Sequence, residues 1–443
     1  MRSLPLTNRR FVAPIGGTLR RSDCKVIAHH LAAPRSLVKG PAIANYEREF
    51  AKYIGTRFAY SFASGRLGLF GILQALDVGA GDEVLLQVPT HVVVPNAIRH
   101  RSAIPIYVDC ARNTYNIDFN AAKRFVTART KVLLVQHTFG VPVDMDTAAA
   151  FADEHGLALV EDCAHALGAR YAGCKVGSFG RASFFSTEEK TISSAMGGIV
   201  VTNDPMVASR IYSFQQGLAW PSALLTARYL LKLLFFYVIT EPSLHPYTRP
   251  LYRFFRSRYI APGATSVAEA EGRVQSSANT RLSNAQAAAA LSQLRNLEAN
   301  LSHRTRIAGL YAESLTMYGF SMPEPPVKAT PAFARYPVLV KDKKLAAERS
   351  SSCVALGQWL SEVIDGARPP ATADYVPGSC PNAEAVVRHL VNLPTHLRVR
   401  EQDVSAIVSA LRDEAWHGDE VYALDGGECA VTGGRTAAQG HTG

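Results

Sequence analysis

Short apolar runs alternate with amphipathic stretches along the first half of the chain. Runs rich in Val, Ile, Leu and Phe that end at Gly, Asp or Asn predict buried strands, and apolar positions at helical spacing predict helices. The predicted strands are residues 59–63, 84–88, 105–108, 131–136, 157–162, 182–186 and 199–204, and the predicted helices are residues 41–54, 67–76 and 144–155. Strands that alternate with helices in this way indicate a largely parallel sheet covered on both faces.

The second half of the chain predicts a smaller α+β unit. Residues 279–286 open a long helix rich in Ala and Leu, strands are predicted at 335–340 and 392–396, and a last helix at 402–411. We therefore expect a basic, irregular N-terminal arm over residues 1–39, a large domain over 40–296 and a small C-terminal domain over 297–413. Residues 414–443 lack apolar periodicity and are predicted to be a disordered tail.

Within the large domain, residues 218–262 form an apolar and then basic segment. Residues 223–240 are almost continuously apolar, but a bilayer span needs roughly 20 such residues, and Arg228 and Lys232 would each cost about 2.5–3.5 kcal/mol at the centre of a membrane helix. We therefore expect no span. The run that follows contains Tyr247, Arg249, Tyr252, Arg253, Phe254, Phe255, Arg256, Arg258 and Tyr259. Two interpretations stay open for residues 221–260: a helix pair on an anionic membrane surface, or a helix pair buried against a partner subunit.

Composition narrows the class of protein. The 443 residues are 47% hydrophobic and 19% charged, as in an ordinary globular protein. The formal charge of +10 favours an anionic partner, and nucleic acid is the weakest choice because no basic cluster lies on a recognisable binding motif. Seven scattered Cys without CxxC pairs argue for a reducing compartment and against a zinc site. The N-terminus has no apolar secretory signal, so we expect a cytoplasmic location.

The strongest chemical signal is a lysine in a loop of small residues. Lys190 lies between the predicted strands 182–186 and 199–204, in a loop that ends in Gly197-Gly198, where a backbone or ligand can approach closely. The strand before this pair ends in Glu161-Asp162, and ligands of open α/β sheets bind at the carboxyl ends of strands. A single loop lysine is usually a solvated charge. Together with Asp162, however, Lys190 suits pyridoxal phosphate, with Lys190 as the Schiff-base lysine and Asp162 keeping the pyridinium protonated.

Three motifs extend this interpretation to a known family. They are Val160-Glu-Asp-Cys-Ala-His-Ala-Leu-Gly168, Val176-Gly-Ser-Phe-Gly180, and Phe185-Ser186 followed by Lys190 and Gly197-Gly198. From about residue 40 to about residue 411 the chain resembles the pyridoxal-phosphate-dependent nucleotide-sugar aminotransferases of the DegT/DnrJ/StrS type, which include perosamine synthase. The resemblance implies an α/β fold of the type I, aspartate-aminotransferase-like class, with residues 218–262 as an insertion.

The resemblance also implies roles for further residues. Ser64, Gly65 and Arg66, at the start of a helix, correspond to the phosphate cradle, and Ser186 would add a hydroxyl to the same phosphate. His91 takes the place of the aromatic ring that stacks on the cofactor, and His165 that of a Gln which bonds its phenolic oxygen. His137 would shape the site. Asn279 would reach the cofactor phosphate of the neighbouring subunit in a homodimer; alternatively, it caps the helix that follows.

The expected function is transfer of an amino group to a nucleotide-linked keto-sugar for polysaccharide, lipopolysaccharide or secondary-metabolite synthesis. The resemblance implies that L-glutamate is the amino donor. A dehydratase of the same family is the first alternative, but such members replace the lysine by His, whereas this chain keeps Lys190. A catalytically idle, membrane-associated scaffold of a polysaccharide assembly system is the second. Two departures concern the loop: Ser186 and Lys190 are one residue closer than usual, and the customary Gly-Glu-Gly-Gly is Ala195-Met-Gly-Gly198.

Overall fold

The seven strands predicted in the first half form one sheet in the computed structural model, which describes residues 10–14, 17–257, 266–273, 279–372 and 374–416. The strand order is β1-β10-β9-β6-β5-β2-β4. Strand β10 is antiparallel to both of its neighbours, and all other pairs are parallel. The bounds are β1 Phe58–Phe62, β2 Glu83–Gln87, β4 Ile104–Val108, β5 Thr130–Gln136, β6 Ala158–Asp162, β9 Ala182–Ser186 and β10 Gly198–Thr202.

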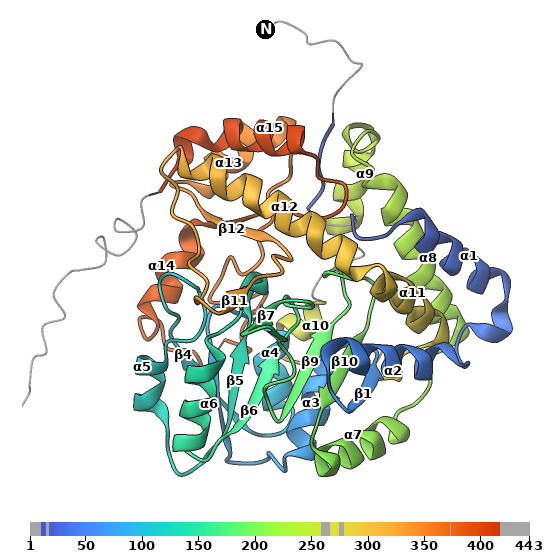
Figure 1. The fold of residues 1–443 in the computed structure, drawn as a ribbon, viewed down its shortest axis with the longest axis vertical. Coiled ribbons are helices and arrows are strands. Elements are labelled where there is room, and N and C mark those ends of the chain that lie inside the picture. Colours follow the sequence, from blue (N-terminus) through green and yellow to red (C-terminus); the bar gives the residue numbers. More distant parts are fainter. Residues whose placement is uncertain (1–9, 15–16, 258–265, 274–278, 373, 417–443) are drawn as a thin grey trace, which may run out of the picture.

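Helices cover both faces of this sheet (Figure 1). Alternate residues of each strand point to opposite faces, so Leu85 and Ile199 enter one apolar cluster, while Leu86 and Val200 enter the other. The first cluster includes residues of α2 Ala42–Ile54, α5 Phe119–Ala122, α6 Met145–Glu154 and α11 Asn284–Arg295. The second includes residues of α3 Gly65–Ala75, α4 Val93–Arg99 and α7 Pro205–Gly217. The predicted type I α/β architecture is confirmed.

The C-terminal part builds a separate apolar core. Its two-stranded sheet pairs β12 Tyr336–Leu339 with β14 Leu390–Leu393 in antiparallel register. The helices of this part are α12 Leu297–Thr316, α13 Lys343–Arg349, α14 Pro381–His389 and α15 Glu401–Leu411. Residues 414–416, which the sequence assigns to the tail, pack here because Ala415 bridges to Val340. The rest of the predicted tail lies outside the described residues, and the domain boundaries stay predictions.

Short strand pairs tie the two parts together. Strand β13 Ile364–Asp365 pairs in parallel with β3 Thr90–His91, which joins a C-terminal loop to the candidate stacking residue His91. Strands β7 Arg170–Tyr171 and β8 Cys174–Lys175 form a small sheet with β11 Ala329–Thr330. The C-terminal part therefore contributes side chains next to the carboxyl ends of the central strands.

The N-terminal arm is not irregular throughout, which corrects the expectation for residues 1–39. Helix α1 Arg21–Ala32 buries Ile27 and packs against α11 and α8. The polar composition of α1 hides it in the sequence, and contact with two other helices stabilises it. Residues 1–9 and 15–16 of the arm lie outside the described part.

The described residues of the segment 218–262 form two helices, α8 Ala223–Ile239 and α9 His245–Ser257. A four-residue helix, α10 Val267–Ala270, follows. Arg258 and Tyr259 of the predicted basic run lie outside the described residues. Across the described ranges, we find no helix with the length and apolar character that crossing a bilayer requires.

Candidate active site

Lys190 lies in a cavity at the carboxyl ends of the central strands. The cavity has a volume of about 90 Å³, and Lys190 is only 8% exposed. Its walls come from the ends of β5, β6 and β9, the first turn of α3, the segment after β2, and one C-terminal loop. The lining residues are Gly65, Arg66, Leu69, His91, Val93, Val94, Gln136, His137, Thr138, Asp162, Ala164, His165, Phe184, Ser186, Glu188, Lys190, Trp359 and Leu360. Seven of the nine residues to which we assigned a catalytic or cofactor-binding role therefore share one cavity, and His137 lines it too.

The loop that carries Lys190 has a defined shape. The N–H of Thr187 donates to the carbonyl of Gly197 and the N–H of Ser194 donates to that of Thr187, both at 2.9 Å. The two hydroxyls of Thr187 and Ser194 lie 2.6 Å apart. Thr18, from the N-terminal arm, donates its hydroxyl to the carbonyl of Lys190 at 3.3 Å.

Three side-chain amides hold the same loop from α11 and α12. Gln286 donates to the carbonyls of Ser194 and Met196. Gln293 donates to the carbonyl of Ser193 and accepts from its N–H, at 2.7 and 2.8 Å. Asn300 donates to the carbonyl of Thr191 at 2.8 Å. Gln286 and Gln293 are seven residues apart on α11, which is two helical turns, so they line one face of that helix. Asn300 follows in the first turn of α12.

The ammonium group of Lys190 is enclosed by rings. Its Nζ lies 3.2 Å from Nε2 of His165 and 3.0 Å from the centre of the Trp359 ring. Burial lowers the pKa of Lys190 well below its ordinary value, and the positive charge of Arg335 lowers it further. A lysine in this environment gives up its proton readily, as a nucleophilic amine and proton carrier must.

Asp162, at the end of β6, is a buried carboxyl group. One of its oxygens accepts the N–H of Ala164 at 2.9 Å. Burial raises the pKa of Asp162 to about 6, because this bond and the charge of Lys190 offset only part of the desolvation. A cationic ring nitrogen would supply the missing compensation.

Two histidines complete the walls of the cavity. Burial lowers the pKa of His91 to about 3, so this ring is neutral. His165 is also held neutral, because burial and the charge of Lys190 lower its pKa well below the usual value. The ring of His165 stacks on Phe139 with the ring centres 6.1 Å apart. Both rings are therefore available as uncharged contacts for a planar cofactor.

The start of α3 forms another part of the cavity wall. Ser64 caps this helix by accepting the N–H of Leu67, and the remaining N–H groups of a first turn have no acceptor within the helix. Gly65 approaches β9 so closely that a Cβ there would lie 3.3 Å from Cβ of Ser186. A Cβ on Gly198 would lie 2.4 Å from the backbone nitrogen of Gly65. The predicted close approach at Gly197-Gly198 is therefore found between the start of β10, at Gly198, and the start of α3.

Arg66 and Asn279 lie towards a second cavity. The guanidinium of Arg66 is paired with the carboxylates of Glu188 and Glu269. Arg66 also lines the second cavity, of about 310 Å³, together with Asn279, which is exposed. Asn279 does not cap the next helix, because Ser283 does so by accepting the N–H of Gln286. Their contacts with phosphate stay predictions.

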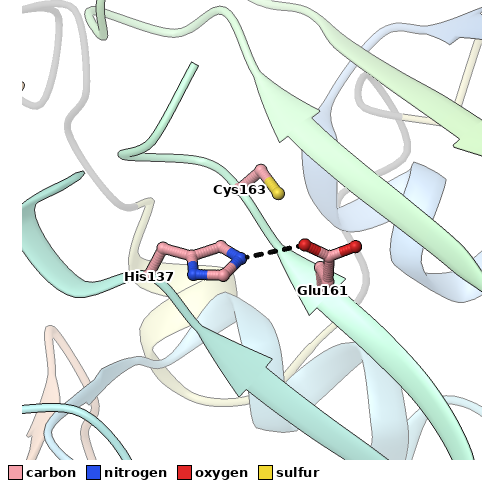
Figure 2. A group of neighbouring side chains, drawn as sticks. All are labelled: His137, Glu161 and Cys163. Atoms are coloured by element: carbon pink, nitrogen blue, oxygen red, sulfur yellow. Dashed lines mark hydrogen bonds and ion pairs between the residues drawn. The ribbon is translucent and has the colours of Figure 1, made fainter. Parts of the chain in front are cut away.

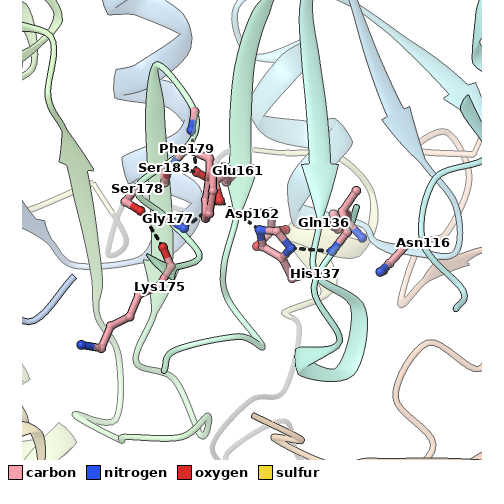
Figure 3. Close-up of polar contacts among 12 residues, drawn as sticks. Asn116, Gln136, His137, Glu161, Asp162, Lys175, Gly177, Ser178, Phe179 and Ser183 are labelled. Carbon is pink, nitrogen blue, oxygen red and sulfur yellow. Dashed lines mark hydrogen bonds and ion pairs between the residues drawn. The ribbon is translucent and has the colours of Figure 1, made fainter. Parts of the chain in front are cut away.

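A buried trio behind the site resembles a metal centre, but its histidine and its carboxylate are already hydrogen-bonded. His137, Glu161 and Cys163 lie within ligand distance of one another (Figure 2). Nδ1 of His137 accepts the N–H of Val143, so Nε2 carries the proton and donates to Glu161 at 3.1 Å. The carboxylate of Glu161 also accepts from the backbone N–H groups of Gly177 and Phe179 and from the hydroxyl of Ser183 (Figure 3). It accepts from the N–H of Gly180 as well.

These bonds leave Glu161 without a lone pair for a cation, so the trio has a structural role. It fastens the ends of β5 and β6 to the turn before β9, as expected for a His137 that shapes the site. The N–H of His137 also donates to the carbonyl of Asp162 at 3.1 Å, which links this support to the candidate acid.

The donor set of the cavity fits pyridoxal phosphate. Lys190 offers the amine, the uncompensated acid Asp162 suits a protonated ring nitrogen, and neutral rings offer faces to a planar group. The helix start at Gly65 suits a phosphate, because the N-terminal end of a helix attracts anions.

Sequence reasoning missed Trp359 and two of the supporting amides. Trp359 stands over Lys190, with the guanidinium of Arg335 4.6 Å from its ring centre. No local motif surrounds it, and only its place in the fold brings it to the lysine. Gln293 and Asn300 lie in an ordinary helical pattern 103 and 110 residues after Lys190, so nothing in their surroundings marks them.

Comparisons with known proteins agree with this geometry. The model of the DegT/DnrJ/EryC1/StrS aminotransferase family matches residues 22–221 and 253–412. GDP-perosamine synthase of Caulobacter vibrioides is 28% identical over 382 residues, which are 84% of this chain and 90% of that protein. GDP-perosamine synthase of Escherichia coli O157:H7 is 37% identical over 183 residues, 41% of this chain and 50% of that protein. The structure of S. venezuelae DesV with a ketimine intermediate has a TM-score of 0.71 at 25% identity and covers 92% of this chain and 98% of its own.

Proposed function

Because this chain belongs to the DegT/DnrJ/EryC1/StrS aminotransferase family and is a pyridoxal-phosphate-dependent sugar aminotransferase, we propose that it moves an amino group from L-glutamate to the keto group of a nucleotide-linked sugar. The observation that carries this proposal is the cavity that joins Lys190 to Asp162 and to the start of α3. An idle scaffold would have no need of a buried, pKa-lowered lysine opposite a buried acid.

We assign the chemical steps to three side chains. Pyridoxal phosphate, when bound, supplies an aldehyde and an electron-accepting ring. Lys190 binds it and then takes a proton from Cα of the amino donor, which its lowered pKa favours. Asp162 would keep the ring nitrogen protonated. His165, whose Nε2 lies beside Lys190 Nζ, would hydrogen-bond the phenolic oxygen of the cofactor. In the second half of the reaction, Lys190 returns a proton to the sugar carbon that receives the amino group.

The substrate class follows from the relatives and from charge. The names of curated relatives include GDP-perosamine synthase and a UDP-N-acetyl-3-dehydro-alpha-D-glucosamine 3-aminotransferase. In both names the sugar is attached to a nucleoside diphosphate, and only the base differs. A spore coat polysaccharide biosynthesis protein of Bacillus subtilis is 29% identical over 388 residues. The net charge of +10 suits a substrate with a diphosphate. We propose that the substrate is a keto-sugar attached to a nucleoside diphosphate and that its product is used in polysaccharide synthesis.

We further propose that the working enzyme is a homodimer with shared active sites. Asn279 is exposed and lines the second cavity rather than the one that holds Lys190. An amide in this position can hydrogen-bond the cofactor phosphate of a neighbouring subunit, because it does not line the lysine cavity of its own chain.

The test separates the two half-reactions. Purified protein supplied with pyridoxal phosphate should be yellow and should lose its colour with L-glutamate in step with formation of 2-oxoglutarate. Addition of a nucleotide-linked keto-sugar should restore the colour and yield an amino-sugar by mass spectrometry. Lys190→Ala should do neither. A sugar product that has lost oxygen and gained no nitrogen would mean dehydration instead, and a colourless wild-type protein would reject the proposal.

A further inference from the structure

Helices α8 and α9 expose an unusual number of large apolar side chains. Seven of the seventeen exposed large hydrophobic residues of the described part lie between positions 224 and 254: Leu224, Leu231, Val238, Leu244, Tyr247, Leu251 and Phe254. The family model matches up to residue 221 and resumes at 253, so almost all of this surface belongs to chain that the family does not share. We call these seven side chains the outer face.

The outer face is organised as two adjoining stripes. Leu224, Leu231 and Val238 follow a seven-residue spacing on α8, so they lie on one side of that helix. Tyr247, Leu251 and Phe254 follow spacings of four and three on α9, and Leu244 directly precedes that helix. Phe235, which falls between Leu231 and Val238 on the α8 stripe, contacts Phe255 with the ring centres 5.0 Å apart. Phe255 is the neighbour of Phe254, so the two stripes meet at this aromatic pair.

Helices α8 and α9 form a helical hairpin, and the opposite side of α8 packs this hairpin against the rest of the enzyme. Leu230 and Leu233 are buried in a cluster with residues of α1 and α11, and Phe236 packs against Tyr252 of α9. The backbone carbonyl of Tyr237 accepts from Arg398 at 2.8 Å. The hairpin lies at the edge of the molecule beside α1 and α11 (Figure 1). Intramolecular packing therefore accounts for the inner side, whereas the outer face stays exposed among the described residues.

The charges around the outer face are almost all positive. Arg228 lies at helical spacing between Leu224 and Leu231 and is exposed, and Arg253 is exposed next to Phe254. Between residues 222 and 257 the only acidic residue is Glu241, which is paired with Arg398. Exposed Leu, Tyr and Phe among arginines are the composition of a helix that lies in the surface of an anionic bilayer.

We propose that the outer face of α8 and α9 docks the enzyme on an anionic membrane surface. The apolar stripes enter the headgroup region while Arg228 and Arg253 contact lipid phosphates. The helices lie on the bilayer and do not cross it, in accord with the absence of a membrane-spanning helix in the described residues. An enzyme docked in this way would release its sugar product next to a membrane. The proposal concerns a surface and stands whether or not the proposed substrate is correct.

The experiment is co-sedimentation of the full-length, pyridoxal-phosphate-loaded protein with vesicles. Vesicles of phosphatidylcholine with about two-fifths phosphatidylglycerol should bind the protein at low salt, and pure phosphatidylcholine vesicles should bind it much less. Because one basic side chain near an anionic bilayer changes binding by a factor of about five, the double variant Arg228→Gln/Arg253→Gln should bind about 25-fold more weakly. Tyr247→Ser/Phe254→Ser should lose at least about tenfold through lost apolar burial.

Matched controls make the test specific to this surface. Met317→Ser/Tyr318→Ser removes two exposed apolar side chains elsewhere, and Arg124→Gln removes an exposed arginine elsewhere; both should bind as the wild type does. The half-reaction with an amino donor should be unchanged in the hairpin variants, which shows that they fold. Absence of wild-type binding to anionic vesicles overturns the proposal. Vesicle binding that is unchanged in both hairpin variants also overturns it. A hairpin variant that changes the oligomer size, in a protein that binds no vesicles, overturns it too, because the outer face would then join copies of the chain.

Discussion

At the scale of single residues, the site is defined by groups whose charge the fold makes unfavourable. Asp162 is the clearest case, because burial raises its pKa to about 6 from an ordinary value near 4. Between these two pH values the folded protein holds more protons than the unfolded chain. The unfolding free energy therefore falls as the pH rises through this window, and the loss persists above it. Two pKa units correspond to about 3 kcal/mol.

We therefore predict opposite effects of Asp162→Asn with and without the cofactor. An asparagine oxygen can still accept the N–H of Ala164, but it carries no charge to desolvate. At pH 8 the cofactor-free variant should be more stable than the wild type by up to about 3 kcal/mol, and near pH 4 the difference should vanish. With pyridoxal phosphate bound, the variant should lose activity by a factor of about 10²–10⁴. Urea unfolding at both pH values measures the first effect. Equal stability changes at pH 4 and pH 8 would refute it.

Lys190 gives a second prediction at this scale. The charge of Arg335 is the largest cause, after burial, of the lowered pKa of Lys190. Arg335→Gln should therefore raise that pKa and move the alkaline reactivity of Lys190 towards higher pH. Labelling of the cofactor-free protein with an amine-reactive reagent across a pH series, followed by peptide mapping, measures it. Arg306→Gln, which removes an arginine paired with Glu401 instead, should leave the profile in place.

At the scale of elements, the lysine loop depends on helices far away in the sequence. Gln293 saturates both backbone groups of Ser193, which is 1% exposed. Gln293→Leu would leave a buried N–H and a buried carbonyl unpaired, at a cost of about 1–3 kcal/mol for each of the two groups. We predict a loss of this size in urea unfolding and faster dissociation of the cofactor on dialysis. Gln402→Leu, at an exposed position of α15, should change neither.

The contact between β10 and α3 gives the next prediction. A Cβ on Gly198 would lie 2.4 Å from the nitrogen of Gly65 and 2.5 Å from the carbonyl carbon of Ser64. Gly198→Ala should therefore push the start of α3 away from the strand ends and weaken cofactor binding at least about tenfold, as followed by absorbance titration. Gly309→Ala, in open space within α12, should stabilise the protein by up to about 1 kcal/mol. Equal cofactor affinity in the Gly198 variant would contradict the proposed phosphate position.

Particular elements show why the sequence predicted part of this arrangement and not the rest. Strand β9 and the end of β6 were predictable because fully buried strands leave continuous apolar runs. Helix α1 was not, because its sequence is polar and its partners come from residues after 220. Trp359 carries no local signal at all, since its place over Lys190 depends on the pairing of β13 with β3. Asp162, His165 and Lys190, by contrast, lie in motifs that resemble those of the family, and these motifs suffice to assign the three residues to one site.

At the scale of the whole molecule, the two cavities bear on the homodimer that we propose. One holds Lys190 and the other holds Asn279, and Arg66 lines both. Within one chain, Asn279 therefore does not line the lysine cavity. A symmetric dimer that exchanges this surface would bring each Asn279 to the phosphate end of the partner's cavity.

This arrangement predicts complementation between two inactive proteins. Lys190→Ala should be inactive because each subunit loses its own catalytic lysine. Asn279→Ala should be impaired because the cofactor phosphate bound in each subunit loses its hydrogen bond to the amide of the other subunit. After the two are unfolded together and refolded at equal amounts, half of the dimers should be mixed, and each mixed dimer has one site with both residues intact. Sugar aminotransferase activity should then rise to about a quarter of the wild-type value. If Asn279 served its own chain or no cofactor at all, mixing would give only the average of the two separate activities, and the shared site would have to be abandoned.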